Sequence, residues 1–254
     1  MASTYTFGDG DLALRRLDLL AEVYGPSSRA LLAEVVPAGA ATALDLGCGP
    51  GHTTRMVAEA CRPARTIGVD VSARCVDHAR ATVGRGRPGI SFVAHDVTAV
   101  PLPGAPADLI YARLLLAHLP DPLAVVARWR TQLAPGGVLV LEEVEAIDPP
   151  PGVLADYERL VTALVADGGG TMAVGPALGA ALGGATVDVP VDVVDAARMF
   201  GLNLATWGDS AVGQGLVTAV EVDRLARELA ALAATGRGTA TVRWVLRQIS
   251  AGPA

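Results

Sequence analysis

Short apolar runs alternate with helical patterns from about residue 43 to residue 142, and this alternation restricts the possible folds more than any other feature. Parallel strands joined by crossover helices require such an alternation. Ser72 precedes one helical pattern as a suitable N-cap, and Pro135 with its glycines ends another. The sequence therefore predicts a doubly wound α/β sheet. The predicted strands are 43–46, 66–70, 90–94, 108–112 and 137–142, and the predicted helices between them are 53–61, 72–83 and 121–134.

The segments on either side of this core depart from simple alternation. Two amphipathic helices are predicted at the start, the first with an apolar face that ends at Tyr24 and the second beginning near Pro26. The segment 168–187 is uncharged, but its glycines and proline predict a loop with a short helix rather than a membrane span. Alternating valines then predict a strand, and Pro190 places that strand at a sheet edge. Helices are also predicted over 153–166 and 217–234, and a last strand lies in TATVRWVLRQI.

These patterns predict four regions along the chain. A helical cap takes residues 1–38, and the α/β core takes residues 39–145. Residues 146–185 form an insertion that shapes the substrate site, and residues 186–254 complete the sheet with a helical insertion of their own.

Composition narrows the classes of partner. The chain has 254 residues, of which 51% are hydrophobic, so it is long enough to bury a sizeable core. Its net charge of −6 gives no basic surface for nucleic acid or an anionic membrane, and a small-molecule partner is predicted. All 20 basic residues are arginine. A Schiff-base lysine and a P-loop lysine are therefore excluded.

The cysteines and histidines predict neither a metal site nor a disulfide framework. Cys48, Cys61 and Cys75 show no CxxC spacing, and only four histidines accompany them. We predict reduced cysteines and no metal. The first residues, MASTYTFGDGD, lack the pattern of a signal peptide, which predicts a cytoplasmic protein.

The stretch LDLGCGPGHTTR places a glycine loop between the first predicted strand and the helix that follows it. Glycines let the backbone approach a ligand, and the free N–H groups of the helix start face it. The loop reads GxGxG, and His52 stands where a dinucleotide fingerprint has its third glycine. Asp70, at the end of the second strand, can accept hydrogen bonds from both ribose hydroxyls of either kind of cofactor. Asp96 is more selective, because its carboxylate after the third strand can accept from an adenine amino group.

In this order, and with ADLIYARLLLAHLPDP and LAPGGVLVLEE after them, the motifs resemble the class I S-adenosylmethionine-dependent methyltransferases. The resemblance covers residues 40–145 and is closest to the small-molecule branch of quinone and antibiotic biosynthesis. It implies S-adenosyl-L-methionine as cofactor and S-adenosyl-L-homocysteine as product. It also implies a Rossmann-like seven-stranded sheet of order 3-2-1-4-5-7-6, with the last strand antiparallel. The motifs of the metal-dependent catechol type are absent from the fourth-strand region.

The resemblance also assigns cofactor contacts. The three loop glycines would run alongside the methionine and ribose part of the cofactor, and Asp70 would bind the ribose diol. Val71 would flank adenine, whose edge Asp96 and the Val97 N–H would read. Arg113 lies where the family contacts the methionine moiety, and Tyr24 is placed to reach its carboxylate. The predicted cofactor residues are Tyr24, Gly47, Cys48, Gly49, Gly51, Thr53, Asp70, Val71, Asp96, Val97 and Arg113.

Candidate catalytic residues follow from the carboxyl edge of the sheet. Methyl transfer depends mainly on orientation, and a general base adds less. His118 is the first candidate for a base, and Glu143, or Glu142 beside it, is a candidate for substrate contact. The alternatives are a histidine that only lines the pocket and a solvated or arginine-paired glutamate. Tyr5 and Phe7 are candidates for a lid over the cofactor or for core between cap and sheet.

Residues 145–185 and 196–216 are predicted to shape the substrate pocket, which suits a hydrophobic or aromatic metabolite. The same side chains could instead pack a lid. They are Tyr157, Met172, Met199, Phe200, Asn203 and Trp207.

The leading hypothesis is therefore a methyltransferase that acts on an oxygen or nitrogen, less readily a carbon, of a small metabolite in bacterial specialised metabolism. The alternative is a methyltransferase-fold enzyme that binds the cofactor structurally and catalyses a cyclisation or rearrangement. A non-catalytic partner subunit and a nicotinamide-dependent oxidoreductase are weaker alternatives. The predicted assembly is a monomer or a homodimer.

Overall fold

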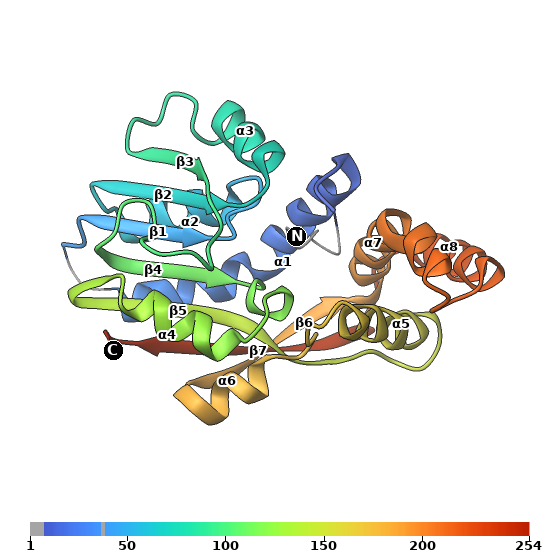
Figure 1. Ribbon diagram of the computed structural model, residues 1–254. Helices are drawn as coiled ribbons and strands as arrows, with labels where there is room; N and C mark the ends of the chain where they lie inside the picture. Colours follow the sequence, from blue (N-terminus) through green and yellow to red (C-terminus); the bar gives the residue numbers. More distant parts are fainter. Residues whose placement is uncertain (1–7, 37–38, 254) are drawn as a thin grey trace.

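A computed structural model describes residues 8–36 and 39–253. The described residues form one seven-stranded sheet of order β3-β2-β1-β4-β5-β7-β6 (Figure 1). Strands β1 to β5 are parallel, and β7 runs antiparallel to both of its neighbours. The predicted fold class and strand order are confirmed. The strands are β1 (Thr42–Leu46), β2 (Arg65–Asp70), β3 (Ile90–Ala94), β4 (Ala107–Arg113), β5 (Leu133–Asp148), β6 (Ala185–Asp192) and β7 (Thr241–Ala251).

The helices pack on both faces of the sheet and beyond its carboxyl edge. Ser72 caps α3 by accepting a hydrogen bond from the Cys75 N–H at 3.1 Å, which confirms the predicted N-cap. The edge position predicted from Pro190 is also confirmed, because β6 pairs with β7 alone in the described sheet. The helices are α1 (Asp11–Val35), α2 (His52–Cys61), α3 (Ala73–Thr82), the 3₁₀ turn η1 (Leu116–His118), α4 (Pro122–Arg130), α5 (Val153–Asp167), α6 (Gly175–Leu182), α7 (Val193–Gly213) and α8 (Ala219–Ala233).

The prediction of two N-terminal helices is wrong. Helix α1 continues from Asp11 to Val35 with Pro26 inside it. A proline in a helix removes one hydrogen bond and crowds the preceding turn, but tertiary packing can override this local preference. Tyr24 and Leu32 are each 1% exposed on either side of the proline, so both halves of α1 are anchored in the core.

Strand β5 is longer than its sequence pattern predicts. It begins at Leu133, where we expected the end of a helix, and continues through Pro135 to Asp148. Helix α4 accordingly ends at Arg130. The added length pairs with β7, whose antiparallel register with β5 runs as far as Asp148. The boundary predicted after residue 145 therefore falls inside this strand.

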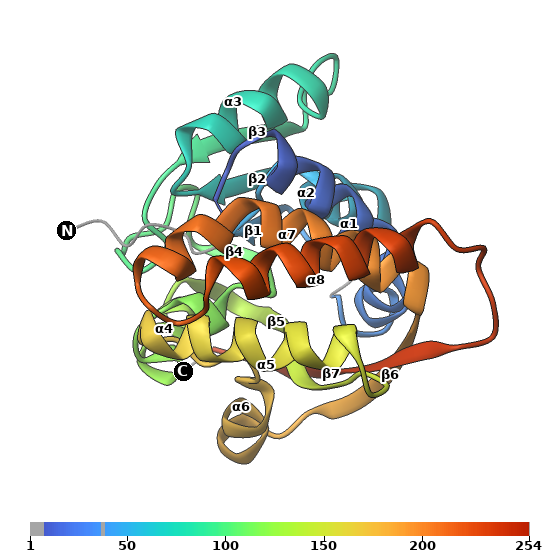
Figure 2. The ribbon, with the colours of Figure 1, turned by 90° about the vertical axis from the view of Figure 1, so that its right-hand side faces the viewer.

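Helices α5, α7 and α8, here called the lid, lie in front of the carboxyl ends of the parallel strands (Figure 2). Helix α7 was not predicted as a helix, although its residues were predicted to shape the substrate site. The apolar face of the lid joins α1 and β7 in one core cluster that includes Tyr24, Tyr157, Phe200 and Trp244. The lid and α1 together cover the edge of the sheet where the candidate site lies. No described helix has the length and hydropathy needed to cross a bilayer.

Candidate active site

The glycine loop connects β1 to α2 and adopts backbone conformations that favour glycine. Gly47, Gly49 and Gly51 have φ of 68°, 51° and 93°. The N–H groups of Gly47 and Cys48 both donate to the Val69 carbonyl of β2, at 2.8 and 3.1 Å. A Cβ on Gly47 would lie 2.9 Å from the Leu115 side chain. The loop is thus held against β2 and the β4 loop with its backbone turned toward the edge of the sheet.

Asp70 joins this loop to the start of α3. Its Oδ2 accepts a hydrogen bond from the Gly49 N–H at 2.8 Å, and its Oδ1 accepts one from the Ser72 N–H at 2.8 Å. Burial raises the pKa of Asp70, and these two N–H donors oppose that shift. The next residue, Val71, is 61% exposed. A carboxylate beside an exposed apolar side chain suits a ribose next to a flat base.

Asp45 is a buried residue next to the glycine loop that the sequence reasoning missed. It is 1% exposed in β1, and its Oδ2 accepts from the hydroxyls of Thr53 and Thr54, at 2.7 and 2.6 Å. Burial raises its pKa to about 6, and the two threonine hydroxyls oppose the shift. Asp45 thereby fixes the first turn of α2 behind the glycine loop, and it orients the predicted cofactor residue Thr53. An aspartate between two buried leucines was the available signal.

The predicted adenine-edge residues lie after β3. Asp96 is exposed, and its Oδ1 accepts hydrogen bonds from both the N–H and the hydroxyl of Thr98, which lower its pKa. Val97 is buried, and its carbonyl accepts from the indole N–H of Trp129 at 2.7 Å. The loop is therefore anchored to α4 from beneath, while the Asp96 carboxylate lies at the surface.

Helix α1 lies across the glycine loop. A Cβ on Gly49 would be 3.5 Å from the Leu17 side chain, and His52 Nε2 lies 2.7 Å from Asp18 Oδ1. Farther along the helix, the Arg113 guanidinium lies 5.7 Å from the centre of the Tyr24 ring. The structure thus brings Tyr24 and Arg113 together, as the methionine end of the predicted cofactor site requires. Tyr5 and Phe7 lie outside the described residues.

The two candidate catalytic residues sit in different environments. Glu143 Oε1 accepts hydrogen bonds from the N–H groups of Leu115 and Leu116, both at 2.8 Å, so this oxygen holds the β4 loop. Burial raises the pKa of Glu143 to about 7. Burial, assisted by the charge of Arg16, lowers the pKa of His118 to about 4. His118 is therefore a neutral imidazole at physiological pH, and base catalysis by either residue stays a prediction.

The side chain of Glu142 forms hydrogen bonds within the sheet. Its side chain accepts hydrogen bonds from the Tyr111 hydroxyl at 2.5 Å and from Gln248 Nε2 at 2.8 Å. It is fully buried. This arrangement favours a structural role for Glu142 in joining β4, β5 and β7.

The α/β core of the chain is similar to a known protein family. Residues 43–137 match the family described as "Methyltransferase domain". Over these residues, which are less than half of the chain, the protein is similar to a methyltransferase domain. The predicted resemblance to the methyltransferases is thereby confirmed for this part of the chain.

Relatives of known name match over part of their length. A trans-aconitate 2-methyltransferase of Azoarcus sp. (strain BH72) is 38% identical over 124 residues, which are 49% of this chain and 47% of the relative. A trans-aconitate 2-methyltransferase of Methylobacterium radiotolerans is 37% identical over 154 residues, which are 60% of this chain and 55% of the relative. The chain thus spans about half the length of the curated relatives it matches.

A solved structure is similar over most of the chain. Coclaurine N-methyltransferase, solved with N-methylheliamine and S-adenosylhomocysteine (SAH), has 14% sequence identity and a TM-score of 0.54, and the match covers 91% of this chain and 71% of that one. At this identity the likeness concerns the fold alone.

Several buried polar atoms of α5, α7 and β7, outside residues 43–137, have no hydrogen-bond partner within 3.5 Å. A buried polar group without a partner costs about 1–3 kcal/mol, and native proteins contain few. In the described structure the set on α5, α7 and β7 comprises Tyr157 Oη, Glu158 Oε2, Asn203 Oδ1, Trp207 Nε1 and Trp244 Nε1. Most of the predicted pocket residues are buried in one region of the core, and Met172 packs against it. The buried ones are Tyr157, Met199, Phe200, Asn203 and Trp207.

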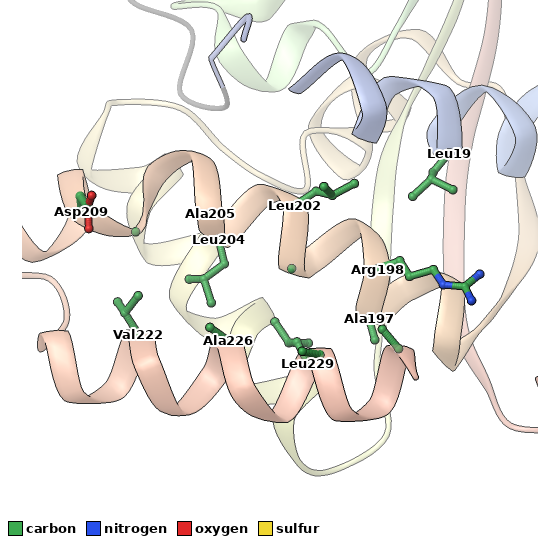
Figure 3. A pocket seen from close by; sticks show the side chains of 14 residues that line it. Leu19, Ala197, Arg198, Leu202, Leu204, Ala205, Asp209, Val222, Ala226 and Leu229 are labelled. Atoms are coloured by element: carbon green, nitrogen blue, oxygen red, sulfur yellow. The ribbon is translucent and has the colours of Figure 1, made fainter. Parts of the chain in front are cut away.

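The lid also forms an apolar groove of about 530 Å³ between α1, α7 and α8 (Figure 3). Leu19, Leu204 and Leu229 line it, with Arg198 and Asp209 among the lining residues. None of the predicted cofactor residues contributes to this groove. It therefore lies apart from the methyltransferase domain's own site.

Folding stability is expected to fall as pH rises from about 5 to about 7.5. Burial raises the pKa of Asp45 to about 6 and those of Glu143 and Glu158 to about 7, so the folded state binds these protons more tightly than the unfolded chain does. Their stabilising contribution is lost as pH rises through those values. His118 opposes the trend, because its folded pKa of about 4 lies below its ordinary value. The three raised carboxyl pKa values together change the folding stability more than the one lowered imidazole pKa does.

Urea unfolding at pH 5.5 and 7.5 measures this difference. Glu143→Gln removes one of the three carboxyls, so the variant is expected to lose less stability over the interval than the wild type does. An equal loss in variant and wild type would contradict the role given to Glu143.

Proposed function

We propose that this chain is an S-adenosylmethionine-dependent methyltransferase that methylates a carboxylate oxygen of a small organic acid. The observation that carries the proposal is the glycine loop held by Asp70 at the carboxyl edge of a sheet whose residues 43–137 match a methyltransferase domain. The acid is suggested by the relatives named trans-aconitate 2-methyltransferase. We therefore propose an organic acid as the substrate in place of the hydrophobic metabolite predicted from the sequence. The proposed acceptor, an oxygen, is one of the two acceptors that the sequence favoured.

The residues of the site fit the proposed cofactor. The loop glycines have positive φ angles, and the Asp70 carboxylate lies beside the exposed Val71. Asp70 would bind the ribose, Val71 would cover the adenine face, and Asp96 would accept from the adenine amino group. Tyr24 and Arg113 would take the methionine end. When bound, the cofactor supplies an electrophilic methyl group on a sulfonium.

Methyl transfer to a carboxylate requires no proton transfer. One acceptor oxygen forms a bond to the methyl carbon while the carbon–sulfur bond breaks, and the electron pair stays on sulfur. The products are a methyl ester, with one negative charge fewer than the acid, and S-adenosylhomocysteine. Because a carboxylate is already deprotonated, the protein's contribution is orientation and exclusion of water, for which effective molarities allow about 7–11 kcal/mol. A neutral His118 can then orient the acceptor without acting as a base.

The test is incubation of the protein with S-adenosylmethionine and a panel of trans-aconitate, cis-aconitate, citrate, a phenol and a primary amine. Mass spectrometry detects the methylated product, and a coupled assay measures S-adenosylhomocysteine. We expect a monomethyl ester from at least one acid, with equal amounts of both products. Methylation of the phenol or amine alone would contradict the acceptor class. An altered acid without S-adenosylhomocysteine would favour the non-methylating alternative.

A further inference from the structure

A small polar cavity of about 50 Å³ lies between α1 and α2, which are neighbours in the fold (Figure 2). An ordered water needs about 10–15 Å³ of such space, so the cavity has room for a small group of several non-hydrogen atoms. Its basic lining comes from three elements. Arg29 lies on α1, Arg55 lies on α2, and Arg113 lies at the end of β4. We call this space the arginine cavity.

The arginine cavity extends along α2, away from the predicted cofactor site. His52 and Glu59 both line it, and they belong to the first and last turns of α2. Because an α-helix rises about 1.5 Å per residue, the lining covers about 10 Å of α2, starting beside the glycine loop. Among the described residues that line the cavity, Arg113 alone belongs to the predicted cofactor set, and its Nη1 donates to the Ser28 hydroxyl of α1 at 3.0 Å. The cavity therefore shares only one wall with the proposed methionine end of the cofactor site.

The guanidinium groups of Arg29 and Arg55 have donors left for a ligand. Within the described structure Arg29 makes neither a hydrogen bond nor an ion pair. A Cβ on Gly25 would lie 3.1 Å from Arg29 Nη2, so this side chain folds back along α1 over a position that has no side chain of its own. Arg55 Nε lies 3.9 Å from Glu59 Oε1, which is beyond hydrogen-bond distance. Both arginines thus present N–H groups to the cavity.

The charge of the lining favours a doubly charged anion. Three guanidinium groups accompany one carboxylate, that of Glu59, whose side chain is 63% exposed. A second carboxylate nearby, that of Asp18, is already bound to His52 at 2.7 Å. Arginine stays protonated at physiological pH, and its planar fork matches phosphate oxygens. Donors from α1, α2 and β4 approach from different directions, which suits a tetrahedral oxyanion better than a planar carboxylate.

We infer that the arginine cavity binds a phosphate group, as free phosphate or as the phosphate ester of a small metabolite, through Arg29, Arg55 and Arg113. This site is additional to the one in the proposed function. A bound phosphate ties α1 to α2. Because α1 also lies across the glycine loop, where Asp18 contacts His52, the phosphate holds α1 in place over the cofactor. Phosphate and cofactor therefore strengthen each other's binding.

The first test is a calorimetric titration with inorganic phosphate in the absence of cofactor. We expect one saturable site per chain. Arg29→Gln and Arg55→Gln are each expected to weaken binding about tenfold or more, because each removes hydrogen bonds between charged groups. Glu59→Gln is expected to strengthen binding about threefold, because it removes the carboxylate of the lining. The matched control is Arg15→Gln, which makes the same charge change at an exposed residue of α1 outside the cavity and should change Kd less than twofold.

Two results of this titration would overturn the inference. One is the absence of saturable binding by the wild type. The other is equal weakening in Arg29→Gln and Arg15→Gln, which would reveal a general attraction between charges. Glycerol 3-phosphate distinguishes the sources of phosphate, since binding tighter than that of inorganic phosphate assigns the cavity to an ester, and weaker binding assigns it to free phosphate. Acetate that binds as tightly as phosphate would overturn the ligand class.

The second test is a titration of S-adenosylhomocysteine with and without saturating phosphate. We expect phosphate to raise its affinity about threefold or more in the wild type and to have no effect in Arg29→Gln. Weaker binding in phosphate would mean that both ligands compete for Arg113, and it would overturn a separate site. Unchanged affinity would overturn the coupling. Failure of S-adenosylhomocysteine to bind at all would refute the proposed function instead, and the first titration would still decide whether the arginine cavity is a phosphate site.

Discussion

Asp70→Asn is expected to weaken S-adenosylmethionine binding about 100-fold, as measured by calorimetry. The Asp70 carboxylate accepts hydrogen bonds from the N–H groups of both Gly49 and Ser72. An amide oxygen can replace one of these acceptors, but the amide NH₂ then faces a second donor. Hydrogen bonds to charged groups contribute about 1.5–3 kcal/mol, and about 1.4 kcal/mol corresponds to a tenfold change in affinity. Loss of the ribose contact and distortion of the glycine loop would both weaken binding of the cofactor.

Asp77→Asn is the control for the Asp70 variant. Asp77 lies on α3 and pairs with Arg80 at the surface, with a side chain that is 73% exposed. Exposed pairs of this kind contribute little, so we expect a change in Kd of less than twofold. Affinity of Asp70→Asn within threefold of the wild type would contradict both the ribose contact and the role of Asp70 in holding the loop.

Trp129→Ala is expected to destabilise the protein by about 3–5 kcal/mol, because it leaves a large cavity beneath β4 and β5. Trp129 is fully buried on α4, and its indole N–H donates to the Val97 carbonyl at 2.7 Å. The variant therefore also releases the loop that carries Asp96. Since whole domains are stable by about 5–15 kcal/mol, the loss is a large part of the total. Urea unfolding with and without S-adenosylmethionine measures both effects.

Two variants of the same helix refine this prediction. Trp129→Phe keeps most of the packing but leaves the Val97 carbonyl without its donor, and we expect a loss of about 1–3 kcal/mol. Leu123→Ala changes a side chain that is 43% exposed, and we expect a loss below about 1 kcal/mol. Equal stability of the Trp129→Ala and Leu123→Ala variants would show that α4 does not anchor the loop that carries Asp96.

Local patterns were sufficient for the core of the sheet. Strand β3 has the bounds Ile90–Ala94 that its apolar run predicts, and Ser72 caps α3 as expected. The glycine loop and Asp70 could be placed together because parallel strands end at the same edge of a sheet. Asp45 was missed because a charge inside a strand becomes informative only when its partners, Thr53 and Thr54, are seen.

The errors occur where distant segments decide the local structure. Pro26 predicted a break in α1, but the helix continues because Tyr24 and Leu32 are both packed in the core. The start of β5 was predicted as helix, whereas its N-terminal residue Leu133 pairs with β4. Such long-range contacts override local preference, and no window of sequence contains them.

The sequence alone determined the strand-and-helix alternation, the glycine loop and the order of motifs that implies the proposed cofactor, because each of these is encoded in neighbouring residues. Only the tertiary structure decided the neutral state of His118, the engagement of Glu143 with the β4 loop, and the meeting of Tyr157 with Asn203 and Trp207. Burial, and the approach of side chains that are distant in sequence, set these properties. They arise only when α1 and the lid cover the carboxyl edge of the sheet.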